Sequence, residues 1–251
     1  VIIPFYNARA FVTQAVESAL SQPETGEVLL IEDGSPDGGI EVCRTLAEKN
    51  DKIRLLQHPN GENRGASASR NLGMRNAQFP YVAFLDADDY YLPNRFTRTK
   101  ELFLHNKYID GIYEATGTYY QDAEAEKLYK KIGSPELTTV KKIIEPDMLF
   151  TSFMKGGIGY FHFNGFTVKA DVFKRIGYFN EELGMYEDTY LMYQLSAKSS
   201  LYPGIIDSPV CMRRVHNDNR IIYRLSNRRL TYETMTPFWD SFLEWGKNEL
   251  T

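Results

Sequence analysis

Three carboxylates stand within four residues at Asp86, Asp88 and Asp89, directly after the apolar run 81–85. Anions this close together repel one another unless a cation neutralises them. Mg²⁺ and Mn²⁺ prefer oxygen ligands and also bridge phosphates, so the pattern favours a divalent metal site beside a phosphate-bearing ligand. The alternative is a capping loop, whose aspartates accept hydrogen bonds from backbone N–H groups ahead of a helix that Pro93 opens.

A second acidic pair, Glu32-Asp33, follows another apolar run at 27–31. The carboxylate of Asp33 can accept a hydrogen bond from the N–H group of a nucleotide base, or it can close an Asx turn. The segment from Asp33 also resembles the start of a calcium-binding EF-hand loop. Arg44 stands where that loop needs its closing glutamate, and the segment before it is apolar and strand-like, so we exclude calcium binding of this kind.

The elements that must position these groups alternate along the first half of the chain. Hydrophobic runs and helical spacing predict the order β-α-β-α-β-α-β. Strands are expected at 1–4, 27–31, 53–56 and 81–85, and helices at 11–20, 40–50, 65–77 and from Pro93. This order is typical of an α/β fold with a mostly parallel sheet, in which ligands bind beyond the carboxyl ends of the strands. Both acidic segments lie at such ends, which predicts a nucleotide site.

The second half of the chain is less regular. The sequence predicts a strand at 111–120, a flexible polar excursion at 121–145 and a strand at 166–169 before a short helix at 172–176. A helix at 188–198, an extended segment at 204–215 and a helical tail at 221–250 follow. We predict a nucleotide-binding half at 1–110 and an acceptor half at 111–217, which together form one domain at 1–217. Residues 218–251 are expected to form a helical extension.

Composition narrows the function classes. A net charge of -4 argues against nucleic acid as a partner. The two cysteines form no CxxC pair and the four histidines show no zinc-binding spacing, so neither a disulfide framework nor a zinc site is supported. No apolar run approaches the ~18 residues that span a bilayer. We predict a cytoplasmic protein, placed at the inner face of the membrane if its acceptor is lipid-linked.

Several segments in one order resemble the inverting family 2 glycosyltransferases, which have the glycosyltransferase A-type fold. They are Val1-Ile2-Ile3-Pro4-Phe5-Tyr6-Asn7, Glu32-Asp33-Gly34-Ser35-Pro36-Asp37-Gly38, Glu62-Asn63-Arg64-Gly65-Ala66-Ser67-Ala68-Ser69-Arg70-Asn71, Phe84-Leu85-Asp86-Ala87-Asp88-Asp89, Ile176-Gly177-Tyr178-Phe179-Asn180-Glu181 and Tyr186-Glu187-Asp188. The resemblance spans about residues 1 to 216. It implies an A-type fold with a Rossmann-like nucleotide-binding half.

The resemblance also implies roles for the matching residues. Nucleotide contacts are expected from Pro4, Tyr6, Asp33, Arg64, Asp86, Ala87 and Asp88. Asp88, Asp89 and His216 are expected to hold Mn²⁺ or Mg²⁺, and Asp188 matches the catalytic base. Glu187, Tyr160 and His162 are assigned to the acceptor side, whereas Arg70 is expected to serve structure. The structural alternatives are a helix N-cap for Asp188, a solvated side chain for His216 and aromatic packing for residues 159–164.

The implied reaction is transfer of one sugar from a nucleoside-diphosphate sugar, with UDP expected by family frequency, to a hydroxyl of a carbohydrate, lipid-linked or protein acceptor. The chain lacks the Q-x-x-R-W element of processive members, which favours a non-processive enzyme. The alternatives are a sugar-1-phosphate nucleotidyltransferase, which would need a glycine-rich loop after the first strand, and an inactive nucleotide-sugar-binding module. In the tail, Phe238, Phe242 and Trp245 share a helical face, which favours packing onto the domain or a second copy over contact with a membrane.

Overall fold

The computed structural model of the chain describes residues 1–131, 133–216, 219 and 228–250. Its first half contains a parallel sheet in the order β1-β2-β3, with β1 (Ile2–Phe5), β2 (Val28–Glu32) and β3 (Ile53–Gln57). The connecting helices are α1 (Val12–Leu20), α2 (Gly39–Lys49) and α3 (Gly65–Asn76), and the short helix η1 (Pro59–Gly61) precedes α3. These elements confirm the predicted alternation of strands and helices.

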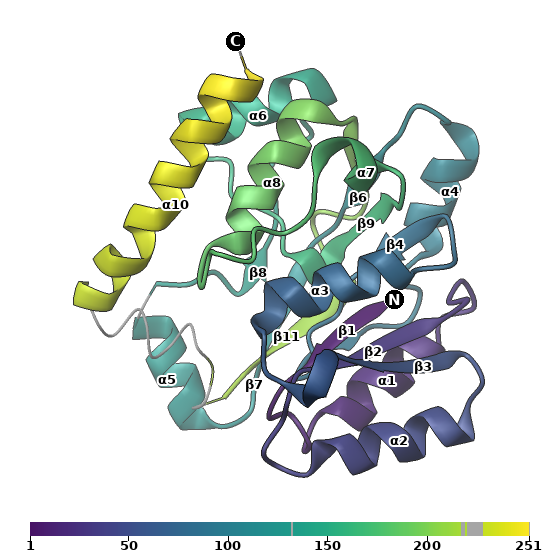
Figure 1. The fold of residues 1–251 in the computed structure, drawn as a ribbon. Helices are drawn as coiled ribbons and strands as arrows, with labels where there is room; N and C mark the ends of the chain where they lie inside the picture. Colours follow the sequence, from purple (N-terminus) through teal and green to yellow (C-terminus); the bar gives the residue numbers. More distant parts are fainter. Residues whose placement is uncertain (132, 217–218, 220–227, 251) are drawn as a thin grey trace.

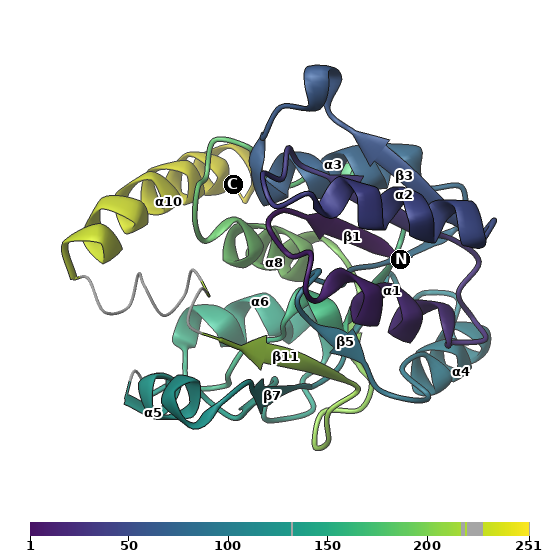
Figure 2. The same ribbon diagram turned by 90° about the horizontal axis from the view of Figure 1, so that it is seen from below.

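Alternate residues of β1 and β2 pack on opposite faces of this sheet. Ile3 and Leu30 join a core with α1 and α2, whereas Leu29 joins a core that includes Met74 of α3. Helices therefore cover the sheet on both sides, which explains why β2 is buried throughout and is apolar up to its last residue, Glu32 (Figures 1 and 2).

The expectation of a mostly parallel sheet is correct for the first half but does not extend to the second. A further sheet has the order β10-β6-β9-β4, formed by β4 (Tyr81–Ala83), β6 (Gly111–Tyr113), β9 (Phe166–Lys169) and β10 (Leu201–Pro203). β9 runs antiparallel to both of its neighbours. The backbone N–H of Leu85 donates to the carbonyl of Ile2 over 3.0 Å, so the chain leaving β4 continues alongside β1. The two sheets are thereby joined at the acidic loop.

The third sheet corrects two predictions. Its order is β5-β11-β7-β8, with β5 (Tyr90–Tyr91), β7 (Thr116–Tyr120), β8 (Leu137–Thr138) and β11 (Cys211–Val215). The predicted strand at 111–120 is therefore two strands in different sheets. The polar segment 121–145 is not only an excursion, because it forms α5 (Ala123–Lys131) and β8. α5 buries Ala125 and Tyr129 and exposes its charged face.

Pro93 does not open a helix. α4 (Thr97–His105) begins four residues later, because residues 93–96 form a turn in which Asn94 has a φ of 65°. A left-handed residue cannot belong to a right-handed helix, so the helix can start only after that turn.

The remaining helices are α6 (Pro146–Lys155), η2 (Phe163–Gly165), α7 (Val172–Ile176), α8 (Glu187–Lys198) and α10 (Arg228–Glu249). The aromatic face of α10 is buried: Phe238 and Phe242 lie against Tyr193 of α8, and Trp245 lies against Phe150 of α6. The tail thus packs on its own domain, as the favoured prediction has it. Residues 221–227 of the predicted tail helix lie outside the described residues.

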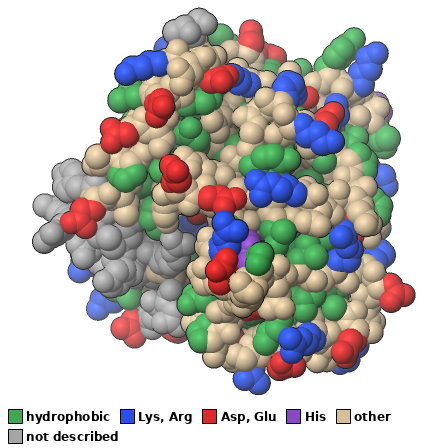
Figure 3. Space-filling model, viewed as in Figure 1, with side chains coloured by type: hydrophobic (Ala, Val, Ile, Leu, Met, Phe, Trp, Pro, Cys, Tyr) green, Lys and Arg blue, Asp and Glu red, His purple; other side chains and the backbone are tan. Residues whose placement is uncertain are grey.

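The surface and the thiols agree with the composition. In the described part of the face in Figure 3, acidic and basic side chains are interspersed rather than gathered into one basic patch. No helix within the described ranges is long and apolar enough to span a membrane. Cys43 and Cys211 are free and buried, and burial raises the pKa of each thiol to about 12, so both stay protonated near neutral pH.

Candidate active site

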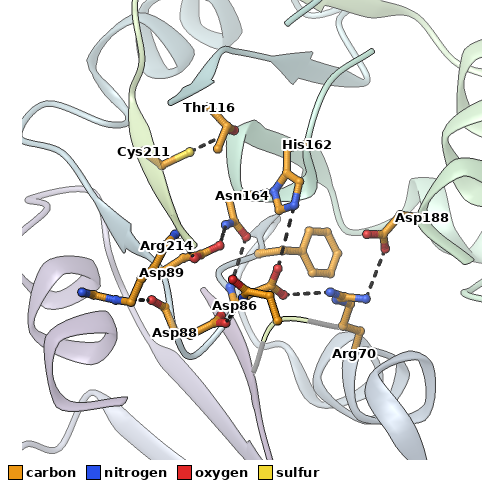
Figure 4. A network of polar contacts seen from close by, with 12 residues as sticks. Arg70, Asp86, Asp88, Asp89, Thr116, His162, Asn164, Asp188, Cys211 and Arg214 are labelled. Carbon is orange, nitrogen blue, oxygen red and sulfur yellow. Dashed lines mark hydrogen bonds and ion pairs between the residues drawn. The ribbon is translucent and has the colours of Figure 1, made fainter. Parts of the chain in front are cut away.

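The acidic loop divides into two outward carboxylates and one inward carboxylate (Figure 4). The side chains of Asp86 and Asp88 are each 28% exposed, whereas Asp89 is 2% exposed. Asp89 accepts hydrogen bonds from the backbone N–H of Arg214 at 2.7 Å and from Nδ2 of Asn164 at 2.5 Å. Burial, with the charges of Asp88 and Asp86, holds the pKa of Asp89 well above its usual range. Asp89 therefore anchors the loop, which argues against its predicted place among the metal ligands.

Asp88 and His216 do lie together. Nε2 of His216 is 3.2 Å from Oδ2 of Asp88, and Nδ2 of Asn219 donates to the same oxygen at 3.3 Å. The described residues contain no cluster of three or more histidine, cysteine, aspartate or glutamate side chains suited to a metal ion. One carboxylate and one imidazole suit Mn²⁺ or Mg²⁺ if a diphosphate and water complete the coordination, which is how such ions usually meet nucleotides. The residues therefore fit a metal that arrives with the nucleotide.

Arg70 is the central cation of the site. It lies in the middle of α3, is 5% exposed, and its Nη2 donates to Oδ1 of Asp86 at 2.8 Å while its Nη1 donates to Oδ1 of Asp188 at 3.1 Å. Glu187 lies 3.7 Å from the same Nη1, and the guanidinium sits 5.2 Å from the ring centre of Phe179. Burial alone would raise the pKa of Asp86, but Arg70, with His162, holds it below its usual value.

Arg70 thus joins the acidic loop to the predicted base, a role that the sequence analysis missed. The available signal was the helix itself: α3 buries a run of polar residues that includes Arg70, which an ordinary surface helix would expose. Asp188 is not an N-cap, because Tyr186 occupies that position with a φ of 64° and Asp188 lies in the first turn of α8. The Asp188 side chain is 37% exposed, so a substrate can reach it.

Asn164, to which the prediction also gave no role, holds the acidic loop from its buried side. It is fully buried in η2, and its Oδ1 accepts from the backbone N–H of Asp86 at 3.1 Å while its Nδ2 holds Asp89. Its own N–H donates to Nδ1 of His162 at 3.3 Å, which leaves Nε2 of that ring facing Asp86. That nitrogen lies 4.0 Å from Oδ2 of Asp86. His162 therefore lines the site beside Asp86, whereas Tyr160, two residues earlier, lies at the surface.

The predicted nucleotide side lies at the ends of β1 and β2. The buried carboxylate of Asp33 accepts hydrogen bonds from the backbone N–H groups of Arg64 at 2.7 Å and Gly65 at 2.9 Å, so it fixes the start of α3. Pro4 is half-buried at the end of β1, while Tyr6 and the side chain of Arg64 are exposed. These four positions surround one edge of the sheet, and their nucleotide contacts stay predictions. The side chain of Ala87 is packed in the core, so only its backbone can meet a nucleotide.

Replacing Asn164 with alanine tests how the loop is held. The change removes a hydrogen bond to the buried Asp89 and another to the Asp86 backbone, which should cost about 2–3 kcal/mol of folding free energy. Nucleotide affinity should fall as well, because Asp86 and Asp88 lose their support. Urea unfolding and calorimetric titration with UDP measure the two effects.

Thr116→Val is the matched control for this experiment. Thr116 is equally buried and its hydroxyl contacts the Cys211 thiol at 3.2 Å, but it does not touch the loop. Thr116→Val should leave nucleotide affinity unchanged. Equal nucleotide affinity of Asn164→Ala and the parent protein would show that Asn164 does not position the loop.

Comparison with known proteins places this geometry in a family. Residues 1–172 match the family model described as Glycosyl transferase family 2. An uncharacterized glycosyltransferase of Haemophilus influenzae is 34% identical over 110 residues, which cover 43% of this chain and 43% of that protein. The minor teichoic acid biosynthesis protein GgaA of Bacillus subtilis is 28% identical over 257 residues, with 96% of this chain and 54% of that protein covered. The chain therefore spans about half or less of the length of these relatives.

Two solved structures share the fold. The crystal structure of S. aureus TarS 1-349 in complex with UDP has a TM-score of 0.64 at 20% identity and covers 89% of this chain and 62% of that chain. The mannosyltransferase PcManGT from Pyrobaculum calidifontis, in complex with GDP-Man and Mn²⁺, has a TM-score of 0.62 at 19% identity and covers 89% and 58%. The glycosyltransferase A-type fold is thus confirmed. The family match covers more than half of the sequence, and the chain belongs to glycosyl transferase family 2.

Proposed function

We propose that the chain is a non-processive, inverting glycosyltransferase that moves one sugar from a UDP-sugar to an acceptor hydroxyl. The observation that carries the proposal is the position of Arg70, which holds Asp86 of the acidic loop and Asp188 of α8 on one guanidinium. A group that can bind the donor and a group that can deprotonate the acceptor therefore lie side by side. The UDP complex of TarS and the GDP-Man complex of PcManGT, which share the fold, support a nucleotide-sugar donor.

The chemistry assigned to each residue follows from its exposure and partners. A divalent cation held by Asp88 and His216 would stabilise the charge that develops on the leaving diphosphate. Asp188 takes the proton from the acceptor hydroxyl as that oxygen attacks the anomeric carbon. Arg70 binds only Oδ1 of Asp188, and among the described residues Oδ2 accepts no hydrogen bond, so this oxygen can face the acceptor. Attack opposite the leaving group inverts the anomeric configuration.

The experiment is a donor screen with product analysis. The chain is incubated with UDP-glucose, UDP-GlcNAc or GDP-mannose and with Mn²⁺, Mg²⁺ or EDTA, and the nucleotide products are separated by chromatography. We expect slow, cation-dependent release of UDP from one UDP-sugar, faster when a suitable carbohydrate, lipid-linked or protein acceptor is added. Thermal shift identifies the donor that binds, since a ligand at 100 times its Kd stabilises a protein by about 2.7 kcal/mol.

Two other results would replace the proposal. Formation of pyrophosphate from UTP and a sugar 1-phosphate would make the chain a nucleotidyltransferase. The end of β1 argues against this, because Pro4-Phe5-Tyr6-Asn7 takes the place of a glycine-rich phosphate loop. Donor binding with no release of a nucleoside diphosphate under any condition would indicate an inactive binding module.

A further inference from the structure

The two neighbouring arginines of β11, Arg213 and Arg214, point to opposite faces of their sheet. Arg214 turns toward the nucleotide half, where its guanidinium donates to Gln14 and to the backbone carbonyl of Asp88 and stacks on Phe11. Gln121 accepts a further hydrogen bond from this guanidinium at 2.8 Å. Side chains alternate along a strand, so Arg213 points to the other face of the sheet. There its guanidinium lies 5.1 Å from the ring centre of Tyr129, on α5.

Arg213 differs from Arg214 in having no polar partner. Within the part of the chain that the structure describes, its side chain makes no hydrogen bond and no ion pair. It is only partly exposed, and burial lowers the pKa of Arg213 although Asp89, Asp86 and Asp88 act on it through space. A half-buried guanidinium without a hydrogen-bonded anion is costly, so proteins seldom keep one without a ligand or a partner.

A second polar group beside Arg213 also lacks a partner. Tyr120 pairs with Val215 across the β7–β11 ladder, and its ring packs edge-on against Tyr129. Its hydroxyl is buried and, among the described residues, has no hydrogen-bond partner. Buried polar groups are nearly always satisfied, so a buried hydroxyl without a partner beside an unpaired guanidinium points to a missing acceptor.

The chemistry of that acceptor follows from the donors. A guanidinium presents a rigid fork of N–H groups that matches the oxygens of a phosphate or a carboxylate, and a phenol hydroxyl can donate to the same group. Arg213 belongs to the half of the chain that also carries Asp188 and His162, and the carboxylates of the acidic loop act on it through space. We infer that Arg213, assisted by Tyr120, binds an oxyanion carried by the acceptor, so that the acceptor substrate is anionic. This inference rests on the proposed transferase function.

The test titrates the two bare oxyanions, inorganic phosphate and acetate, into the protein saturated with UDP and Mg²⁺, with KCl at equal ionic strength as reference. UDP occupies the donor site, so a further rise in melting temperature reports a second site. We expect one of the oxyanions to bind, and its identity distinguishes a phosphate-bearing from a carboxylate-bearing acceptor. Arg213→Gln should weaken that binding at least about tenfold, the loss expected when a charge-assisted hydrogen bond is removed. Tyr120→Phe should weaken it less.

The controls separate this inference from the proposed function. Arg175→Gln removes the same charge from an exposed arginine that pairs with Asp110, and it should leave oxyanion binding intact. UDP affinity, measured on each variant by calorimetry, should be unchanged in Arg213→Gln. If UDP itself does not bind, the proposed function fails. If UDP binds but neither oxyanion does, or if Arg213→Gln weakens UDP and not the oxyanion, the inference about the acceptor is overturned while the proposed function stands.

Discussion

Asp188→Asn is expected to reduce the turnover number for sugar transfer by about 10² to 10⁴, the usual contribution of a positioned base. The asparagine side chain keeps the shape of the carboxylate and can still accept a hydrogen bond from Arg70, but it cannot take the proton of the acceptor hydroxyl. UDP affinity should stay within a factor of two or so, because binding is assigned to other residues. Initial rates with saturating donor and calorimetric titration with UDP measure the two quantities.

Two variants sharpen this test. Asp171→Asn makes the same chemical change at the exposed start of α7 and should not alter the rate. Glu187→Gln removes the neighbouring carboxylate, which lies 3.7 Å from Arg70. Near-normal transfer by Asp188→Asn would reject Asp188 as the base, and if Glu187→Gln were then inactive, the role would pass to Glu187.

Arg95→Met is expected to destabilise the fold by about 3–5 kcal/mol, the typical cost of leaving one member of a buried ion pair alone. Arg95 and Glu114 are both fully buried, and Nη1 of Arg95 lies 2.6 Å from Oε2 of Glu114. Nε of Arg95 also donates to the carbonyl of Asn164 at 3.2 Å, so the pair supports the residue that holds the acidic loop. Urea denaturation followed by circular dichroism gives the change in unfolding free energy.

The double variant Arg95→Met with Glu114→Leu separates charge from packing. It should be more stable than Arg95→Met alone, because no unpaired carboxylate is left in the core. Arg98→Met breaks an exposed pair with Glu101 on the same helix and should cost no more than about 1 kcal/mol. Equal losses of unfolding free energy for Arg95→Met and Arg98→Met would show that the buried ion pair contributes no more to stability than the exposed one.

The first half of the fold could be predicted from the sequence because its signals are local. The apolar runs that become β1, β2 and β3 and the helical spacing of α1 to α3 need no knowledge of distant residues. The second half depends on long-range pairing. β9 enters the sheet antiparallel between β6 and β4, and Gly165 just before it packs so closely that a Cβ there would lie 2.2 Å from the carbonyl oxygen of Glu114. No local sequence pattern predicts a contact of this kind.

The site divides in the same way. The apolar runs predicted that Asp33 and the acidic loop would each follow a strand, and they follow β2 and β4. It could not predict that Asp89 turns inward, since that depends on Asn164, 75 residues away in sequence. Nor could it assign Arg70, whose partner Asp188 is 118 residues further along the chain. Residues that a motif places side by side can therefore differ completely in what they do.

The packing of α10 links the end of the described chain to the chemistry. Phe238 and Phe242 lie against Tyr193 on the flank of α8, the helix whose first turn carries Asp188. α8 is therefore braced on one side by α10. A binding partner, or a neighbouring domain, that pulled α10 away would expose aromatic rings of α8 to water and weaken the support of Asp188, the proposed base. The tail is thus a point from which the proposed transfer reaction can be controlled.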